Sequence, residues 1–282
     1  MFRAFLAALA IIPLGGAALA DCANDAEIAT FVQSYLSRTP ARALGAGGDM
    51  DDALCTQGKL AAVLAESLGP VVGYKAGLTS KPAQDRFGVT EPVHGVLYRD
   101  MLLPAGAEVP AAFGTIPMLE ADLLLVIGDA AINQATTPEE AMAHISAIRP
   151  FIELPDMTLA KGEPITGETL TAMGVAPRLG VMGPEIAVSD PAAMLNMLAG
   201  MTVTLMAADG TVLTEAPGAA VLGNPVNSVL WLLSKGITFQ PGDVVSVGSF
   251  GPLLPVAKAP GGANLRYTGL PGDPEVSVTF VE

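Results

Sequence analysis

Two acidic residues lie inside an apolar segment, 118-MLEADLLLVIGD-129. Side chains in a strand alternate between its two faces, so Glu120 and Asp122 would point to the same side. Two ionised carboxylates this close repel each other, and burial penalises each of them further. A hard divalent cation such as Mg²⁺, Mn²⁺ or Ca²⁺ removes both penalties because it prefers oxygen ligands. The plainer interpretation places the pair at the solvent-exposed end of an edge strand.

A third carboxylate, Glu153, lies in the short apolar segment 150-PFIELPD-156. A capped helix, 137-TPEEAMAHISAI-148, stands between the two apolar segments, which predicts a strand, a crossover helix and a second strand. That arrangement would place Glu153 beside the acidic pair and give three oxygen ligands, with open positions for water and substrate. Alternatively, Glu153 is a strand-end charge paired with a basic residue such as Arg149.

One lysine, Lys75, is placed among glycines and apolar residues in 73-GYKAGLTS-80. Lysine is uncommon in such surroundings unless it is paired or functional. At a carboxylate site it could bind a substrate carboxylate or, with a lowered pKa, move a proton. A surface lysine whose aliphatic chain lies on apolar neighbours is the alternative interpretation.

The other titratable residues near these segments carry weaker signals. His144 lies in the capped helix and is interpreted as a structural residue, and Asp156 and Glu163 are interpreted as solvated loop charges. The chain has two histidines and no Gly-x-Ser-x-Gly motif, which argues against a serine hydrolase. No Walker-type or dinucleotide-binding glycine motif is present either.

Two kinds of segment must position these residues. Residues 26–37 and 58–69 carry apolar residues at three- and four-residue steps, which is typical of helices. From residue 70 onward, short apolar runs are punctuated by glycine and proline, which predicts strands. We therefore expect an α+β fold, with a helical lobe over residues 21–69 and a mixed, mainly β, curled sheet over residues 70–282. Further helices are expected at 190–200 and 225–236, and strands at 201–207, 211–215, 243–249 and 276–281.

Residues 1–20 have the pattern of a cleavable export signal. A short basic start at Arg3 precedes an apolar stretch, and 18-ALA-20 is a small-x-small cleavage site. The stretch is short for the roughly 20 apolar residues of a membrane span, and proline and glycine interrupt it. We expect cleavage after Ala20 and a periplasmic or secreted protein. An uncleaved anchor and a cytoplasmic chain are the alternatives.

The two cysteines of the chain, Cys22 and Cys55, both lie in the part expected to be exported. In an oxidising compartment they could form a disulfide that ties the N-terminal tail to the first helical region. Two unpaired thiols, or lipid modification of Cys22, are the alternatives that the sequence leaves open.

The formal net charge of the chain is −14. So acidic a protein is not expected to bind nucleic acid or an anionic membrane surface, and no membrane association is expected once the signal is removed. A small anionic substrate is still compatible with this charge, because a bound cation can reverse the local sign of a site.

In order and spacing, segments 73–101, 119–129 and 150–156 resemble the fumarylacetoacetate hydrolase superfamily. They read GYKAGLTSKPAQDRFGVTEPVHGVLYRDM, LEADLLLVIGD and PFIELPD. Within that superfamily the chain is similar to the branch that contains 2-keto-4-pentenoate hydratase and 4-oxalocrotonate decarboxylase, and residues 223–256 resemble the C-terminal block of that branch. The resemblance covers roughly residues 60–281.

The resemblance implies a curled, barrel-like mixed β fold with an N-terminal helical lobe. It also implies an Mg²⁺ or Mn²⁺ ion, a lysine beside the substrate and two substrate-binding residues. The implied metal ligands are Glu120, Asp122 and Glu153, the lysine is Lys75, and the substrate-binding residues are Leu78 and Ser249.

Several residues depart from the pattern of that branch. Its second metal ligand is normally glutamate, so Asp122 is one methylene shorter. Val93 and His94 stand where an acidic residue and an aromatic residue are usual, and His94 is either a proton-transfer residue that replaces the acid or a loop filler. Residues 171–180 lack the usual acid and amide, and Asn224 replaces a histidine.

Two functions are therefore carried forward. The first is a metal-dependent hydratase or lyase for a short 2-oxo or 2-hydroxydienoic acid, which acts through an enolate; decarboxylation and C–C hydrolysis share that chemistry. The second is an exported, non-catalytic or weakly catalytic binding protein for small 2-oxo acids. A small 2-oxo acid is the expected partner in both cases, and a homo-oligomer is left open.

Overall fold

A computed structural model describes residues 22–282, so the expected signal segment lies outside the described residues. The described chain begins with two helices, α1 (Asp25–Ser37) and α2 (Met50–Leu68). Each begins at a capping box, made by Asn24 for α1 and by Asp49 for α2, in which the cap side chain accepts a backbone N–H of the first turn. Among residues 22–282, no helix combines the length and apolar character that a membrane span requires.

The larger of two sheets follows the strand order β2-β1-β11-β5-β6-β7-β3, and β12 and β8 pair outside this path, with β5 and β6 respectively. It is mixed: β1 pairs with β11 in parallel, and β11 pairs with β5 antiparallel. Its strands are β1 (Val71–Gly77), β2 (Val93–Tyr98), β3 (Leu102–Pro104), β5 (Met118–Ile127), β6 (Ile145–Leu154), β7 (Leu179–Met182), β8 (Ile186–Ala187), β11 (Val244–Ser246) and β12 (Leu254–Pro255).

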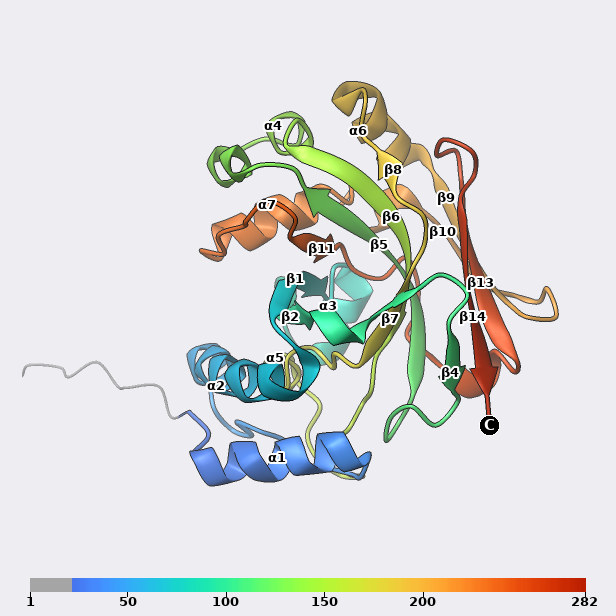
Figure 1. Ribbon diagram of the computed structural model, residues 1–282. Helices are drawn as coiled ribbons and strands as arrows, with labels where there is room; N and C mark the ends of the chain where they lie inside the picture. The colour runs from blue at the N-terminus through green and yellow to red at the C-terminus, as the bar shows by residue number, and fades with distance from the viewer. Residues whose placement is uncertain (1–21) are drawn as a thin grey trace, which may run out of the picture.

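The smaller sheet has the order β10-β9-β13-β14-β4. In Figure 1 it stands beside the curled larger sheet, and the main apolar core fills the space between them. Its strands are β4 (Glu108–Pro110), β9 (Thr202–Ala207), β10 (Val212–Pro217), β13 (Gly262–Thr268) and β14 (Glu275–Val281). The other α-helices are α3 (Lys81–Phe87), α4 (Pro138–Met142), α5 (Gly167–Ala172), α6 (Pro191–Gly200) and α7 (Asn227–Ser234). The expected α+β fold, with a curled mixed sheet and N-terminal helices, is confirmed.

The two long central strands, β5 and β6, pair antiparallel. A crossover helix between them was the wrong prediction, because crossovers join parallel strands. The capped helix ends at Met142, and β6 already begins at Ile145. Residues 128–144 are therefore the connection of a long hairpin. The antiparallel register still pairs Glu120 with Glu153, so the expected neighbourhood of the carboxylates is formed by a different topology.

A second apolar core lies between the larger sheet and the helical lobe. Leu124 and Phe151 belong to it, and they share the face of the sheet that carries the carboxylates. The opposite face of β5 contributes Leu123 and Leu125 to the core between the sheets. Both faces of β5 are therefore covered, and the solvent-exposed edge strand that was the alternative for this segment is excluded.

The smaller sheet also reaches into the ladder between β5 and β6. Tyr267 of β13 is buried, and its hydroxyl donates to the backbone carbonyl of Asp122 and accepts from the N–H of Phe151 at 3.1 Å. Asp122 and Phe151 are paired in register, so the phenol stands where the two strands face each other. Burial raises the pKa of this phenol well above its usual range, which keeps the hydroxyl protonated as a donor.

A disulfide joins Cys22 to Cys55, so the expected pairing is confirmed and the two unpaired thiols are excluded. It links Cys22, just before the cap of α1, to the second turn of α2 across 33 residues of sequence. Next to it, the N–H of Ala23 donates to the Thr56 hydroxyl at 3.0 Å.

Replacing both cysteines with serine should lower the free energy of unfolding by about 3–4 kcal/mol, because the open loop gains conformational entropy in the unfolded chain. Urea denaturation of the variant and of the wild type, each with and without a reducing agent, measures this. Reduction should destabilise the wild type to the level of the variant and leave the variant unchanged. Equal stability of oxidised and reduced wild type would contradict the prediction.

Candidate functional site

Lys75 lies on β1, with its side chain directed into the space over the central strands. It is 2% exposed, its ammonium forms an ion pair with Glu153, and it donates to the carbonyl of Val175 at 2.9 Å. Gly73 explains how the strand reaches this position: a Cβ there would come within 1.9 Å of the Val244 carbonyl on β11. The surface-lysine interpretation is therefore wrong, and Lys75 is a buried counter-charge.

Glu120 and Glu153 are direct neighbours across β5 and β6. Glu153 is 1% exposed, and Glu120 is half-buried. Burial, followed by the negative charge of Glu153, raises the pKa of Glu120 well above its usual range, although Lys75 acts in the opposite direction. Two carboxyl groups in this position resist being ionised together unless a further positive charge is present.

Asp122 is 0% exposed and is surrounded by hydrogen-bond donors. One oxygen, Oδ1, accepts the N–H of Leu123 at 2.6 Å and that of Gly248 at 3.0 Å, and Oδ2 accepts the hydroxyl of Ser246. Burial, followed by the charge of Glu153, raises the pKa of Asp122 to about 7, against the lowering effect of the hydrogen bonds from Ser246 and Leu123.

Whether a metal ion fits this site depends on which carboxylate oxygens are available to bind it. Within residues 22–282 there is no group of three His, Cys, Asp or Glu side chains arranged to hold a metal ion, and the oxygens of Asp122 accept three hydrogen bonds. The three-ligand set thus stays a prediction. Glu120 and Glu153 nevertheless fit a divalent cation, since their oxygens are hard donors and the cluster has three carboxylates for one ammonium, Lys75.

A strained turn supports Lys75 from the side of the helical lobe. Gly174, Val175 and Ala176 all have positive φ values, of 77°, 61° and 54°. Val175 is β-branched, and such a residue rarely adopts this conformation. The Val175 carbonyl is the one that accepts from Lys75, so the strain is located where the lysine is held. This turn belongs to the stretch 171–180, where the expected acid and amide are absent.

Val93 fills the place expected for an acidic residue. A Cβ on Gly77 would lie 3.5 Å from the Val93 side chain and 2.6 Å from that of Val175, so both valines stand at the end of β1. Val93 is 3% exposed. This side of Lys75 is therefore apolar, and it offers no proton donor or acceptor to a substrate.

His94 lies apart from the carboxylates. It pairs with Ala76, whereas Gly95 pairs with Lys75, so the imidazole projects from the opposite face of the sheet. Its ring is 6.0 Å from that of Trp231 on α7, and its Nδ1 has no hydrogen-bond partner. Burial, helped by Lys235, lowers its pKa. The structure does not bring His94 to the site where it could replace the missing acid.

Leu78 and Ser249 are placed at one corner of the site. Leu78 directly follows β1 and has a φ of 55°. Ser249 follows Gly248, where a Cβ would come within 2.5 Å of the hydroxyl of Thr79. The segment that carries Ser249 therefore lies against the end of β1 beside Leu78. The Ser249 hydroxyl donates to the carbonyl of Gly251 at 2.9 Å.

Two acidic residues expected to be solvated have structural roles instead. Asp156 is 1% exposed and accepts the N–H groups of Thr115 and Ile116 at 2.9 and 2.7 Å, so it holds the segment that leads into β5. Glu163 accepts the N–H of Ala43 at 2.8 Å. The interpretation of Asp156 as a solvated charge was therefore wrong, whereas Glu163 is partly exposed and also binds a backbone group. The backbone groups that these carboxylates bind lie far away in sequence, so no local pattern could reveal them.

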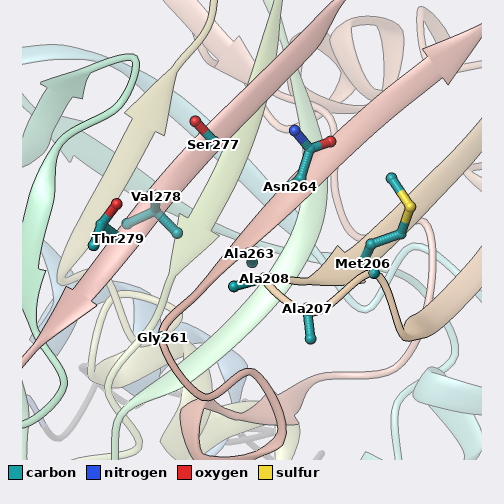
Figure 2. Close-up of a pocket in the computed structure, with 10 residues that line it drawn as sticks. Met206, Ala207, Ala208, Gly261, Ala263, Asn264, Ser277, Val278 and Thr279 are labelled. Carbon is teal, nitrogen blue, oxygen red and sulfur yellow. The ribbon is translucent and has the colours of Figure 1, made fainter.

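Two hollows lie away from the carboxylates. The first, of about 290 Å³, lies on the smaller sheet between Met206, Asn264 and Ser277, and its lining has no titratable side chain (Figure 2). The second, of about 330 Å³, lies at the edge strand β2 and includes His94 and Trp231. The first has no side chain for acid–base or metal chemistry, whereas the second includes Glu91, His94 and Lys235 but none of the three carboxylates predicted to bind the metal. The buried cluster is the candidate site because it combines these three carboxylates with Lys75.

Comparison with known proteins agrees with this arrangement. Residues 74–268 match the family described as fumarylacetoacetate (FAA) hydrolase, C-terminal. The chain is 31% identical over 216 residues to a 2-keto-4-pentenoate hydratase of Burkholderia vietnamiensis, which covers 75% of this chain and 79% of that protein. It is 31% identical over 193 residues to a 2-hydroxyhexa-2,4-dienoate hydratase of Comamonas testosteroni, which covers 66% and 71%.

Solved structures show the same fold. A 4-oxalocrotonate decarboxylase from Pseudomonas putida G7, complexed with magnesium and adipate, matches 91% of this chain and 96% of its own with a TM-score of 0.76 and 22% identity. A fumarylpyruvate hydrolase from Pseudomonas aeruginosa, in complex with Mn²⁺ and pyruvate, matches 74% and 88% with a TM-score of 0.55 and 19% identity.

The chain belongs to the fumarylacetoacetate hydrolase family. Within it, the chain is an enzyme of the hydratase and lyase type that its relatives represent. Nothing in the names of these relatives supports the alternative of a non-catalytic binding protein.

The raised pKa of Asp122 makes stability depend on pH when divalent cations are removed by a chelator. Between the ordinary value of 3.8 and about 7, the folded state binds more protons at Asp122 than the unfolded chain does. The free energy of unfolding should therefore fall by a few kcal/mol, relative to Asp122→Asn, as pH rises through this window, and then level off. Thermal denaturation of both proteins from pH 4 to 8 measures the difference. Parallel stability curves would contradict the assignment.

Proposed function

We propose that the chain is an Mg²⁺- or Mn²⁺-dependent hydratase or lyase for a short 2-oxo or 2-hydroxydienoic acid. The names of its relatives support the substrate class, since they include hydratases of 2-keto-4-pentenoate and 2-hydroxyhexa-2,4-dienoate. The magnesium and Mn²⁺ in two structures of the same fold support the choice of cation.

One observation carries the proposal: the buried cluster of Glu120, Asp122 and Glu153 has Lys75 as its one cationic partner among the described residues. Glu120 and Glu153 would hold the cation, because their carboxyl groups face each other at the centre of the sheet. When bound, a divalent cation withdraws electron density from the carboxylate and 2-oxo group of a substrate and so favours its enolate form.

Lys75 is proposed to act on the substrate through Nζ. An ammonium has three donors, and two of them are used by Glu153 and the Val175 carbonyl. The third is available for a substrate carboxylate or for a proton transfer at the alkenyl carbons. The valines at 93 and 175 exclude water from one side of this lysine, which strengthens its electrostatic interactions. Water addition, decarboxylation and C–C hydrolysis all pass through an enolate, so these residues serve each of them.

Replacing Glu120 or Glu153 with glutamine should abolish Mg²⁺ binding and lower kcat/KM for 2-hydroxypenta-2,4-dienoate by about 100-fold or more, since an amide is a weaker ligand for a hard cation. Calorimetric titration with Mg²⁺ and the loss of dienoate ultraviolet absorbance measure the two effects.

Glu163→Gln is the matched control, because Glu163 binds the Ala43 N–H away from the cluster and should leave both measurements unchanged. Equal Mg²⁺ binding by the wild type and Glu120→Gln would overturn the metal assignment. Ligand-induced thermal stabilisation by 2-oxo acids without turnover would favour the binding-protein alternative, which the apolar Val93 at the place of an acid motivates.

We further propose that the enzyme is exported and cleaved after Ala20. The pattern of residues 1–20 supports export. The Cys22–Cys55 disulfide supports it independently, because such bridges persist in oxidising compartments.

Expression of the whole chain in a Gram-negative host should yield a periplasmic protein whose first residue is Asp21, because signal peptidase removes the leader. Intact-mass measurement of the periplasmic and cytoplasmic fractions tests this. A protein that keeps residues 1–20 and stays in the cytoplasm would contradict export.

A further inference from the structure

The segment that follows β11 runs along β5 with an irregular hydrogen-bond pattern. The N–H of Val247 donates to the Leu123 carbonyl at 3.1 Å, and the N–H of Phe250 donates to the Ala121 carbonyl at 2.9 Å. Between these two hydrogen bonds, the segment after β11 advances three residues while β5 advances two. The segment therefore has one extra residue relative to β5. Residues 248–249 therefore form a β-bulge beside the carboxylate cluster.

The bulge leaves a backbone donor without a ladder partner, and Asp122 supplies the acceptor. The N–H of Gly248 donates to Asp122 Oδ1 at 3.0 Å. Ser246, the last residue of β11, donates its hydroxyl to Oδ2 of the same carboxylate. Both groups and the carboxylate are buried, and an unpaired buried N–H would cost free energy comparable to a lost hydrogen bond.

The length of the Asp122 side chain suits the binding of the Gly248 N–H. Asp122 Oδ1 also accepts the N–H of its own neighbour, Leu123, at 2.6 Å, so the carboxyl group lies close to the backbone of β5. A glutamate would carry its carboxylate one methylene farther from that backbone and away from both amides. The length of Asp122 thus favours binding the bulge over reaching a cation.

We propose that Asp122 is a positioning residue, which anchors the bulge that carries Ser249, and that Glu120 and Glu153 alone supply the protein carboxylates for the cation. This inference rests on the proposed metal-dependent function for its second half. The first half, the anchoring of the bulge, stands on the hydrogen bonds of Asp122 alone.

The bulge connects the cluster to the end of β1. Gly248 has a φ of 107°, and a Cβ there would come within 2.5 Å of the Thr79 hydroxyl and 3.0 Å of the Ala76 carbonyl. Only glycine fits both the conformation and the space. Anchoring Gly248 therefore fixes Ser249 relative to the β1 end at Leu78, which are the two positions expected to contact the substrate.

Amide hydrogen exchange of Gly248 in chelator-treated protein tests the anchor without a metal. Asp122→Ala should speed exchange of this amide by about tenfold or more, because its acceptor is lost. Asp122→Asn keeps an oxygen acceptor in the same place and should restore protection to within about threefold of the wild type. Asp122→Glu keeps the charge but moves the carboxylate, so it should exchange like the alanine variant.

Asp156→Asn is the matched control, since Asp156 anchors a different segment through Thr115 and Ile116 and should leave Gly248 protection unchanged. If Asp122→Ala does not fold, Ser246→Ala tests the same anchor, and it should speed exchange of the Gly248 amide by a smaller factor. Wild-type protection of Gly248 in the folded variant that lacks the anchor would overturn the proposal.

If Asp122 positions the bulge, weakening the anchor should change substrate binding, measured as KM, more than the chemical step, measured as kcat. Ser246→Ala should raise KM for 2-hydroxypenta-2,4-dienoate about tenfold and change kcat by less than about threefold, because Ser246 touches the anchor and not the reacting atoms. A lower kcat with unchanged KM would overturn this role.

A crystal structure with Mn²⁺ tests the ligand set. Oxygens of Glu120 and Glu153 should lie within bonding distance of the ion, about 2.2 Å, and those of Asp122 should keep their bonds to Gly248 and Ser246. An Asp122 oxygen at bonding distance would overturn the two-glutamate set. If no ion binds between the glutamates, the proposed metal-dependent function fails, while amide exchange still decides the role of Asp122.

Discussion

The antiparallel pairing of β5 with β6 places Glu120 opposite Glu153 in the interior, and much of the surrounding structure responds to that placement. Like charges in a medium of low polarity raise each other's pKa, and the shift of Glu120 follows from burial together with this neighbour. Lys75 offsets part of the repulsion from a third strand. Strands that bring a lysine and several acids together in a largely buried place carry an electrostatic cost, which a bound cation would reduce.

Three parts of the chain that are distant in sequence stabilise this arrangement. The strained turn at Val175 gives a backbone carbonyl to Lys75, and the bulge at Gly248 gives an amide to Asp122. From the other sheet, Tyr267 gives its hydroxyl to the backbone between β5 and β6. Each of these contacts uses a conformation or a burial that is unfavourable by itself, so the surrounding core must hold it in place.

Period-two alternation was enough to predict that Glu120 and Asp122 share a face. Glu153 does lie beside them, although its position was predicted from a crossover helix that the antiparallel pairing excludes. The topology was missed, because a capped five-residue helix with an apolar continuation reads as a longer helix until β6 pairs with β5. His94 was misplaced for a related reason. Its face of β2 depends on the register with β1, which local sequence does not set.

The buried roles of Asp156 and Val175 were beyond sequence reasoning for a different reason. Asp156 binds amides some forty residues away, and the Val175 carbonyl matters only through its backbone conformation. The type of a residue does not show which partner the tertiary fold will bring next to it. By contrast, the Cys22–Cys55 pair could be predicted, because two cysteines in a chain expected to be exported have one possible intramolecular partner each.

The Tyr267 hydroxyl also constrains motion. Because a side chain of the smaller sheet takes part in the ladder of the larger one, the two sheets cannot slide past each other by a residue without breaking hydrogen bonds at Asp122 and Phe151. The interface between the sheets is therefore locked against shear. On the opposite side, the helical lobe and the turn at Val175 cover the lysine. There the disulfide joins the segment before α1 to α2, so the two helices that form this wall of the site are held to each other.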